Sequence, residues 1–120
     1  MIEVSTKTAY LSGQSHPEAE QYVFSYTITI TNHSDNMVKL LSRYWQITDA
    51  NGDTTIVEGE GVIGQQPSIP PAESFTYTSG SMLKTPLGTM EGRYYMKDHN
   101  GDEIKVKIPV FRLAIPNILN

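Results

Sequence analysis

The chain has 120 residues, and nine Lys and Arg stand against thirteen Asp and Glu, which gives a formal net charge of −4. Its length predicts one domain over residues 1–120, large enough for a hydrophobic core. The absence of cysteine excludes disulfides and thiolate metal sites. The acidic balance and the scatter of Lys and Arg argue against a nucleic acid polymer as partner. Without a signal peptide or a long apolar run, the sequence predicts a cytoplasmic protein with no membrane insertion.

Apolar and polar residues alternate through most of the chain, which is the pattern of half-buried strands. In residues 21–31, Tyr22, Phe24, Tyr26, Ile28 and Ile30 share one face. Similar patterns predict further strands at 2–11, 40–49, 54–59, 73–79, 92–98 and 103–113. No window reads as an amphipathic helix. The sequence therefore predicts an all-β fold, an antiparallel sandwich of seven to eight strands in immunoglobulin or fibronectin type III style.

Two turns and one proline refine this prediction. Asn51-Gly52 and Asn100-Gly101 each lie between two predicted strands, and Asn-Gly favours a type I′ hairpin turn with positive φ at both residues. Pro109 interrupts the last predicted strand, because proline cannot donate a ladder hydrogen bond. We therefore expect that strand to lie at an edge or to contain a bulge.

The stretch GEGVIGQQP contains G-x-G-x-x-G at Gly59, Gly61 and Gly64. A dinucleotide site needs a helix that begins at the third glycine, but three prolines between 67 and 71 exclude one. A P-loop is excluded because no Gly-Lys-Ser/Thr follows. We favour the interpretation that the glycines serve turns or close backbone approach. The alternative is an anion nest for pyrophosphate or a nucleotide, aided by Arg43 or Lys84.

Other candidate chemistry is sparse. His16, His33 and His99 are isolated in predicted loops, and DANGD lacks the glycine position of a calcium loop. With no thiol and no G-x-S-x-G, we predict that the protein is not an enzyme and has no cofactor and no metal site. Tyr94 and Tyr95 are adjacent in a predicted strand, so they point to opposite faces. One of them therefore lies outside the core, where it either binds a partner or packs across strands.

Several ordered segments together resemble the ApaG family, over about residues 3–113: RYWQITDANG, VEGEGVIGQQP, SFTYTSG, TPLGTMEGRYYM and IPVFRL. The resemblance implies a fibronectin type III-like sandwich. Bacterial members of the family are linked to cobalt and magnesium resistance and to diadenosine polyphosphate metabolism. Similar domains in eukaryotic F-box and polymerase-interacting proteins imply a protein-interaction role, and the glycine motif implies pyrophosphate or nucleotide binding. Where the family has Pro-Gly-Glu, this chain has Pro71-Ala72-Glu73, which puts a glycine-dependent turn in doubt.

The leading hypothesis is a non-enzymatic cytoplasmic module that binds an unidentified protein partner, with a homodimer through an edge strand as one form of it. The second hypothesis is a small-ligand module in which Gly59, Gly61, Gly64 and Arg43 hold pyrophosphate or a nucleotide. A divalent-ion buffer ranks last, because the sequence shows no cluster of metal ligands.

Overall fold

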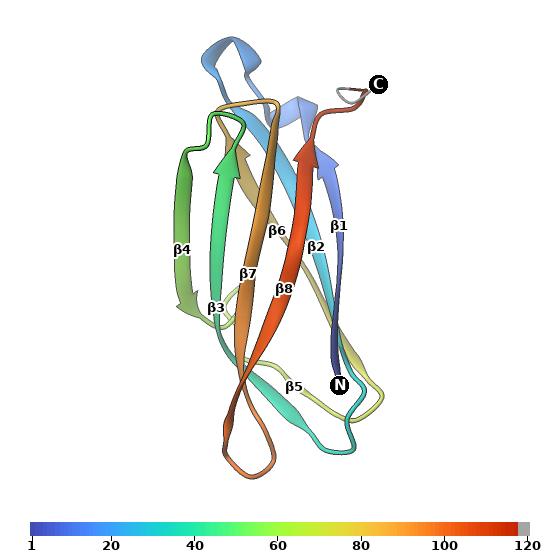
Figure 1. Ribbon diagram of the computed structural model, residues 1–120. Coiled ribbons are helices and arrows are strands. Elements are labelled where there is room, and N and C mark those ends of the chain that lie inside the picture. Colours follow the sequence, from blue (N-terminus) through green and yellow to red (C-terminus); the bar gives the residue numbers. More distant parts are fainter. Residues whose placement is uncertain (118–120) are drawn as a thin grey trace.

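The computed structural model describes residues 1–117, where eight strands form two antiparallel sheets (Figure 1). The smaller sheet has the order β1-β2-β6, with β1 at Ile2–Tyr10, β2 at Tyr22–Asn32 and β6 at Ser74–Leu83. The larger sheet has the order β4-β3-β7-β8, formed by Thr54–Glu60, Val38–Asp49, Leu87–Lys97 and Glu103–Ala114. Strand β5, Ser68–Ile69, pairs with the start of β3, and two 3₁₀ turns, Ser12–Gln14 and Pro17–Ala19, join β1 to β2. The predicted all-β antiparallel sandwich of seven to eight strands is confirmed.

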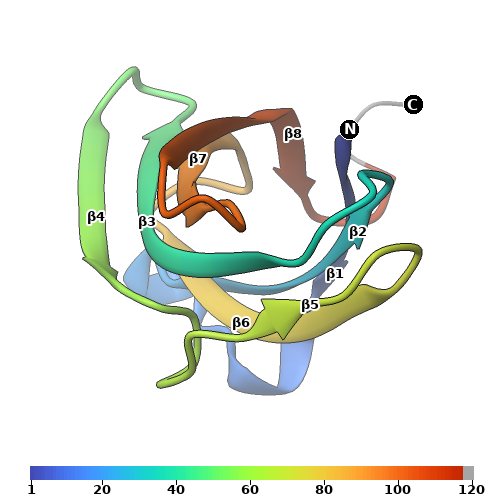
Figure 2. The ribbon, with the colours of Figure 1, turned by 90° about the horizontal axis from the view of Figure 1, so that it is seen from below.

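The core lies between the two sheets, which Figure 2 shows from one end of the strands. Every second residue of β2 is buried, from Phe24 to Ile30, as the alternation predicted. Trp45 of β3 is at the centre of an aromatic cluster, with ring centroids 5.4 Å from Tyr26 and 5.7 Å from Phe111. Such edge-to-face contacts stabilise beyond simple area burial, and the contact of Tyr26 with Trp45 joins the two sheets.

The two Asn-Gly hairpins are confirmed, but their predicted turn type is wrong. Of the Asn-Gly residues only the glycines have positive φ, 85° at both Gly52 and Gly101. Each turn closes over three residues, and the carboxylate of Asp49 or Asp98 accepts the backbone amides two and four residues later. These hydrogen bonds favour a type I turn followed by one left-handed glycine over the type I′ turn.

One long side of the sandwich is closed. Strands β1 and β8 lie side by side there, and Thr8 Oγ1 donates to the carbonyl of Arg112. Strand β8 is an edge strand, and its pairing with β7 skips a residue around Pro109, between Ile108 and Phe111. Both features expected from Pro109 are therefore present. A proline and a bulge at an edge discourage pairing with another chain.

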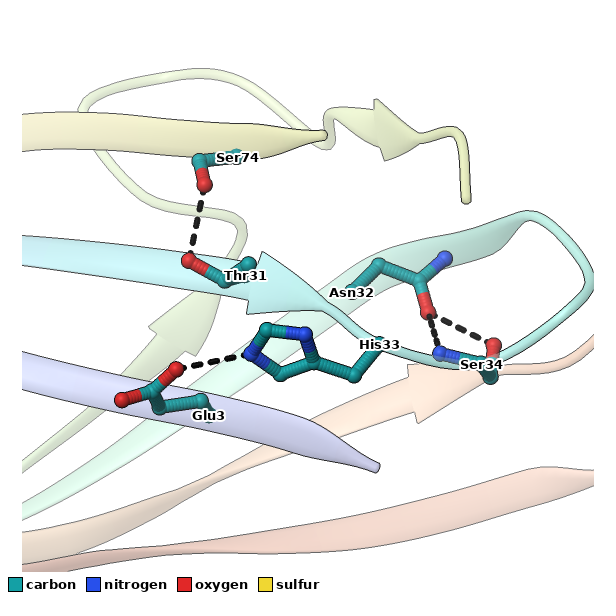
Figure 3. A network of polar contacts seen from close by, with 6 residues as sticks. All are labelled: Glu3, Thr31, Asn32, His33, Ser34 and Ser74. Carbon is teal, nitrogen blue, oxygen red and sulfur yellow. Dashed lines mark hydrogen bonds and ion pairs between the residues drawn. The ribbon is translucent and has the colours of Figure 1, made fainter. Parts of the chain in front are cut away.

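A buried asparagine ties the loops at one end of the sandwich together (Figure 3). The side-chain amide of Asn32 donates to the carbonyls of Asn36 and Ile69, and its Oδ1 accepts both the amide and the hydroxyl of Ser34. The backbone carbonyl of Asn32 accepts the amide of Ala72 at 2.8 Å. The backbone amide of Asn32 also donates to the carbonyl of Glu73, at 3.0 Å. Four polar groups of this fully buried residue are therefore bonded, and they connect loops from separate parts of the chain.

The turn before β6 forms with alanine, and not glycine, at residue 72. Glu73 donates to the carbonyl of Pro70, and Ala72 has φ 66°, which is the left-handed region expected at the third position of a type II turn. The Pro71-Ala72-Glu73 segment therefore forms the turn, but Ala72 is strained in it. An L-residue in this region costs about 1–2 kcal/mol.

We expect Ala72→Gly to stabilise the protein by roughly 0.5–1 kcal/mol, because relief of the strain exceeds the added entropy of glycine in the unfolded chain. Urea unfolding would measure the change. Ala50→Gly is the matched control, since Ala50 is exposed and its φ is not positive. It should lower stability, and equal effects of the two variants would contradict the strain argument.

Candidate functional site

The glycine motif forms the end of β4 and the turn that follows it, which we name the glycine loop, residues 59–65. Gly59 lies in β4 opposite Arg43, and Gly61 and Gly64 have φ 64° and 77°. Val62 and Gln65 exchange two backbone hydrogen bonds, so the chain reverses between them. No helix follows, as the prolines predicted, and the chain continues to β5.

Each glycine has its own local reason. A Cβ at Gly59 would lie 2.8 Å from Arg43 Nη1, and a Cβ at Gly61 would collide with the backbone carbonyl of Gln65. Gly64 has open space around it, but its positive φ belongs to the reversal. The favoured interpretation of turns and close approach therefore has a structural basis at all three positions.

Arg43 contacts the glycine loop through carbonyl groups. Its Nη1 donates to the carbonyls of Glu60 at 3.2 Å and Gly61 at 2.9 Å. The carbonyl of Leu41, where the pairing of β3 with β7 skips a residue, accepts the amide of Gly61 and the side chain of Gln66. The structure thus brings Arg43, Gly59 and Gly61 together, as predicted for a ligand site. Here, however, the guanidinium is bonded to the loop itself.

Within the loop, the amides of Gly61, Val62 and Gln65 donate to other backbone groups. Among the residues described, the amides of Ile63 and Gly64 donate to no other group. An anion nest here would therefore depend on two adjacent amides.

Ile63, at the tip of this loop, was not predicted to have a role. It is 53% exposed and has φ 43°. A β-branched residue in the left-handed region is a rare, strained conformation. The sequence places Ile63 directly before Gly64, but no local pattern predicted a positive φ at the isoleucine as well as at the glycine.

The long side of the sandwich opposite β1 and β8 is open. A cavity of about 360 Å³ lies between β4 and β6, and its wall includes Arg43, Trp45, Val57, Ile63 and Tyr77. A second cavity of about 190 Å³ continues past Ile47 toward Met82. We name these two cavities together the β4–β6 slot. Its exposed apolar rim consists of Val57, Ile63 and Met82, which are 36%, 53% and 59% exposed.

Tyr77 in the wall of the slot contacts a second, buried tyrosine behind it, Tyr94. The hydroxyls of Tyr77 and Tyr94 lie 2.5 Å apart, and burial raises the pKa of both phenols well above that of tyrosine in water. The Nε1 of Trp45 is buried without a hydrogen-bond partner. Protonated phenols and an indole do not supply a general base.

Tyr94 and Tyr95 do point to opposite faces, and this separates the two candidates. Tyr94 is fully buried beside Trp45, so it does not present its ring to a partner, and a partner-binding role for Tyr94 is not retained. Tyr95 lies on the outer face of the larger sheet and accepts a hydrogen bond from Arg93 Nε. Of the pair, only Tyr95 stays a candidate for partner binding.

The histidines do not gather. His33 bonds to Glu3 at 2.7 Å (Figure 3). His16 lies 3.6 Å from Glu18, and His99 is exposed in the β7–β8 turn. Over residues 1–117, no group of three His, Asp or Glu side chains is placed to hold a metal ion. In the same residues, no helix is long and apolar enough to cross a membrane.

Comparisons with known proteins agree on one family. The model of the ApaG domain matches residues 12–98. Protein ApaG of Pectobacterium carotovorum is 53% identical over 117 residues, with 98% of this chain and 94% of that protein covered. Protein ApaG of Vibrio vulnificus is 54% identical over 119 residues, with 99% and 94% covered. The crystal structure of a Bordetella pertussis protein named ApaA has a TM-score of 0.95 and 44% identity, and the match covers 98% of this chain and 95% of that one.

We expect Gly61→Ala to lower the free energy of unfolding by about 2 kcal/mol or more, because its Cβ would meet the carbonyl of Gln65 at a positive φ. Gly13→Ala is the control, since Gly13 has no atom near its Cβ position and no positive φ. Chemical denaturation measures both. If Gly61→Ala kept full stability, the packing role of this glycine would be refuted.

Proposed function

The chain belongs to the ApaG domain family, and we propose that it is a non-enzymatic, cytoplasmic protein-interaction module, one domain over residues 1–120, that binds a protein partner along strand β4. The observation that supports this proposal most is the contrast between the two edges of the larger sheet. At β8 a proline and a bulge protect the edge, whereas Thr54–Glu60 contains neither lysine nor proline. An unprotected edge strand presents unpaired N–H and C=O groups to another chain.

Strand β4 also exposes two apolar side chains. Ile56 is 46% exposed on the outer face, and Val57 is 36% exposed at the rim of the slot. An extended segment that paired with β4 would place alternate side chains on these two faces. Its main-chain hydrogen bonds would give affinity, and the slot beneath Val57 would select the side chain that enters it.

The partner on this proposal is an extended segment of another protein or β4 of a second copy. A homodimer is the simplest occupant, because two β4 strands related by a two-fold axis pair antiparallel, as a closed symmetric dimer requires. In either case the family's links to cobalt and magnesium resistance and to diadenosine polyphosphates act through the partner. Tyr95, two strands away on the outer face, extends the same surface.

We expect Ile56→Lys to weaken partner binding or dimerisation about tenfold, because a lysine on an edge strand disfavours the addition of another strand. Val110→Lys is the matched control, since Val110 is 58% exposed on the opposite edge. Sedimentation over a concentration series measures self-association. Affinity capture with mass spectrometry compares the partners of the two variants, and hydrogen exchange reports protection of residues 54–60. Equal binding by both variants would refute the role of β4, and a monomer with no captured protein would refute the proposal.

The second candidate is a small-ligand module that binds pyrophosphate or a nucleotide at Gly59, Gly61, Gly64 and Arg43. The cavity of about 360 Å³ beside the loop, with Arg43 in its wall, favours it. It ranks second because Arg43 already donates to two loop carbonyls and Glu60 also lines the cavity. Like-signed oxygens close to the site oppose an anion.

This candidate predicts that pyrophosphate or ATP shifts the amide NMR signals of Ile63 and Gly64, the two that donate to no other described group. The signals of Gly61 and Val62 should move less, because their amides are already bonded. The Gly13 amide, in the β1–β2 connection, is the internal reference. Unshifted signals of Ile63 and Gly64 at millimolar ligand would exclude an anion site in the loop.

A further inference from the structure

The fold gathers most of the cationic side chains on one surface. Each of six cationic residues alternates with core residues in the larger sheet and so lies on its outer face: Lys39, Arg93, Lys97, Lys105, Lys107 and Arg112. The chain has nine Lys and Arg in total. These residues are scattered along the sequence, which argued against a nucleic acid polymer as partner, but in the folded chain they lie on one surface. We name this surface the basic face.

The register places like charges directly opposite each other on this face. Lys39 pairs with Lys97 across β3 and β7, and Arg93 pairs with Lys107 across β7 and β8. Like charges in cross-strand pairs are destabilising. Lys97 also lies opposite Glu103, but within residues 1–117 the ion pairs shorter than 4.0 Å are those of His16 and His33. The folded chain thus keeps two like-charged pairs in which neither partner forms an ion pair shorter than 4.0 Å, although Glu103 lies opposite Lys97 and Glu58 acts on the charge of Arg93.

At the centre of the basic face, a cation is held in a fixed position. The guanidinium of Arg93 lies 4.1 Å from the centroid of the Tyr44 ring, and its Nε donates to the hydroxyl of Tyr95. Lys107 is directly across from Arg93, and Lys105 is directly across from Tyr95. A groove of about 320 Å³ lies here, and its lining includes Tyr44, Arg93, both lysines, Gln46 and Glu91. Because the guanidinium is already ordered, binding an anion to it costs less entropy.

We propose that the basic face binds an acidic segment of a partner protein, whose carboxylates lie between Arg93, Lys105 and Lys107. This binding would neutralise the Arg93–Lys107 repulsion, which gives the partner a stabilising effect beyond its direct contacts. The outer face of the smaller sheet offers no such attraction, because it is a ladder of hydroxyl pairs such as Thr27–Thr78 and Thr29–Thr76.

Four carboxylates favour a protein over a nucleic acid as the occupant. Glu91 borders the groove, Glu58 is close enough to act on the charge of Arg93, and Glu60 and Glu103 lie at the limits of the face. A continuous phosphate backbone would meet these carboxylates. A peptide places its carboxylates against the lysines and turns backbone N–H groups to Glu91. This proposal shares Tyr95 with the surface proposed beside β4, but its lysines lie in β8. Substitution of Lys105 and Lys107 leaves β4 unchanged, so either proposal can fail alone.

The probe is a fluorescein-labelled oligoglutamate peptide, and anisotropy measures its dissociation constant. We expect the double variant Lys105→Gln/Lys107→Gln to weaken binding at least about fivefold. The control double variant Lys7→Gln/Lys84→Gln removes two exposed cations from other surfaces and should change binding less than about twofold. Affinity should fall as salt rises from about 50 to 200 mM.

A second readout does not depend on any ligand. Lys107→Gln alone should raise the midpoint of thermal unfolding, because it removes the repulsion between Lys107 and Arg93. If Lys107 instead stabilised the fold, the same substitution would lower the midpoint. Oligoglutamate should raise the midpoint of the unmodified protein more than that of the double variant at the same peptide concentration. The proposal is overturned if both double variants weaken binding equally, if no peptide binds at low salt, or if single-stranded DNA or inorganic polyphosphate binds more tightly than the peptide with the same dependence on Lys105 and Lys107.

Discussion

The guanidinium of Arg43, inside the open side of the sandwich, fixes the geometry on which the rest of that side depends. It lies over Gly59, where no side chain fits, and it holds the carbonyls of Glu60 and Gly61. This contact ends β4 and sets the course of the loop toward Ile63. The contacts of Arg43 with Gly59 and Gly61 therefore shape this part of the wall of the slot. The same hydrogen bonds occupy the guanidinium that an anion would need. The contacts that shape the loop therefore oppose the binding of a phosphate there.

The backbone arrangement was largely predictable from the sequence. Alternation located the strands, Asn-Gly located two hairpins, and Pro109 indicated an edge with a bulge. These are local signals, because each depends on neighbours within a few residues. The turn type was not predictable from Asn-Gly alone, since the aspartate two residues before the asparagine decides it through its hydrogen bonds to later amides. Likewise, the conformation of Ala72 depends on a carbonyl of Asn32, forty residues earlier in the chain.

The candidate surfaces were less accessible to sequence reasoning, for the same physical reason. The pairing of Arg93 with Lys107, and of Lys39 with Lys97, follows from register between strands that no local pattern specifies. The glycine motif resembles a known anion site, but the side chain that it exposes is the apolar one of Ile63. Two adjacent tyrosines were correctly placed on opposite faces, yet only the register showed which ring faces the solvent. Side-chain exposure and charge clustering are properties of the assembled sheet.

The aspartates that close the two hairpins have an influence far beyond their turns. A shift of one residue in pairing turns every following side chain to the opposite face of a sheet. The carboxylate of Asp98 therefore determines, several residues away, that lysines of β8 face the solvent while Ile104 and Ile108 face the core. Asp49 does the same for the apolar residues of β4. The two aspartates thus fix the register of β8 and β4. Each outer surface depends on a turn residue that lies outside the surface itself.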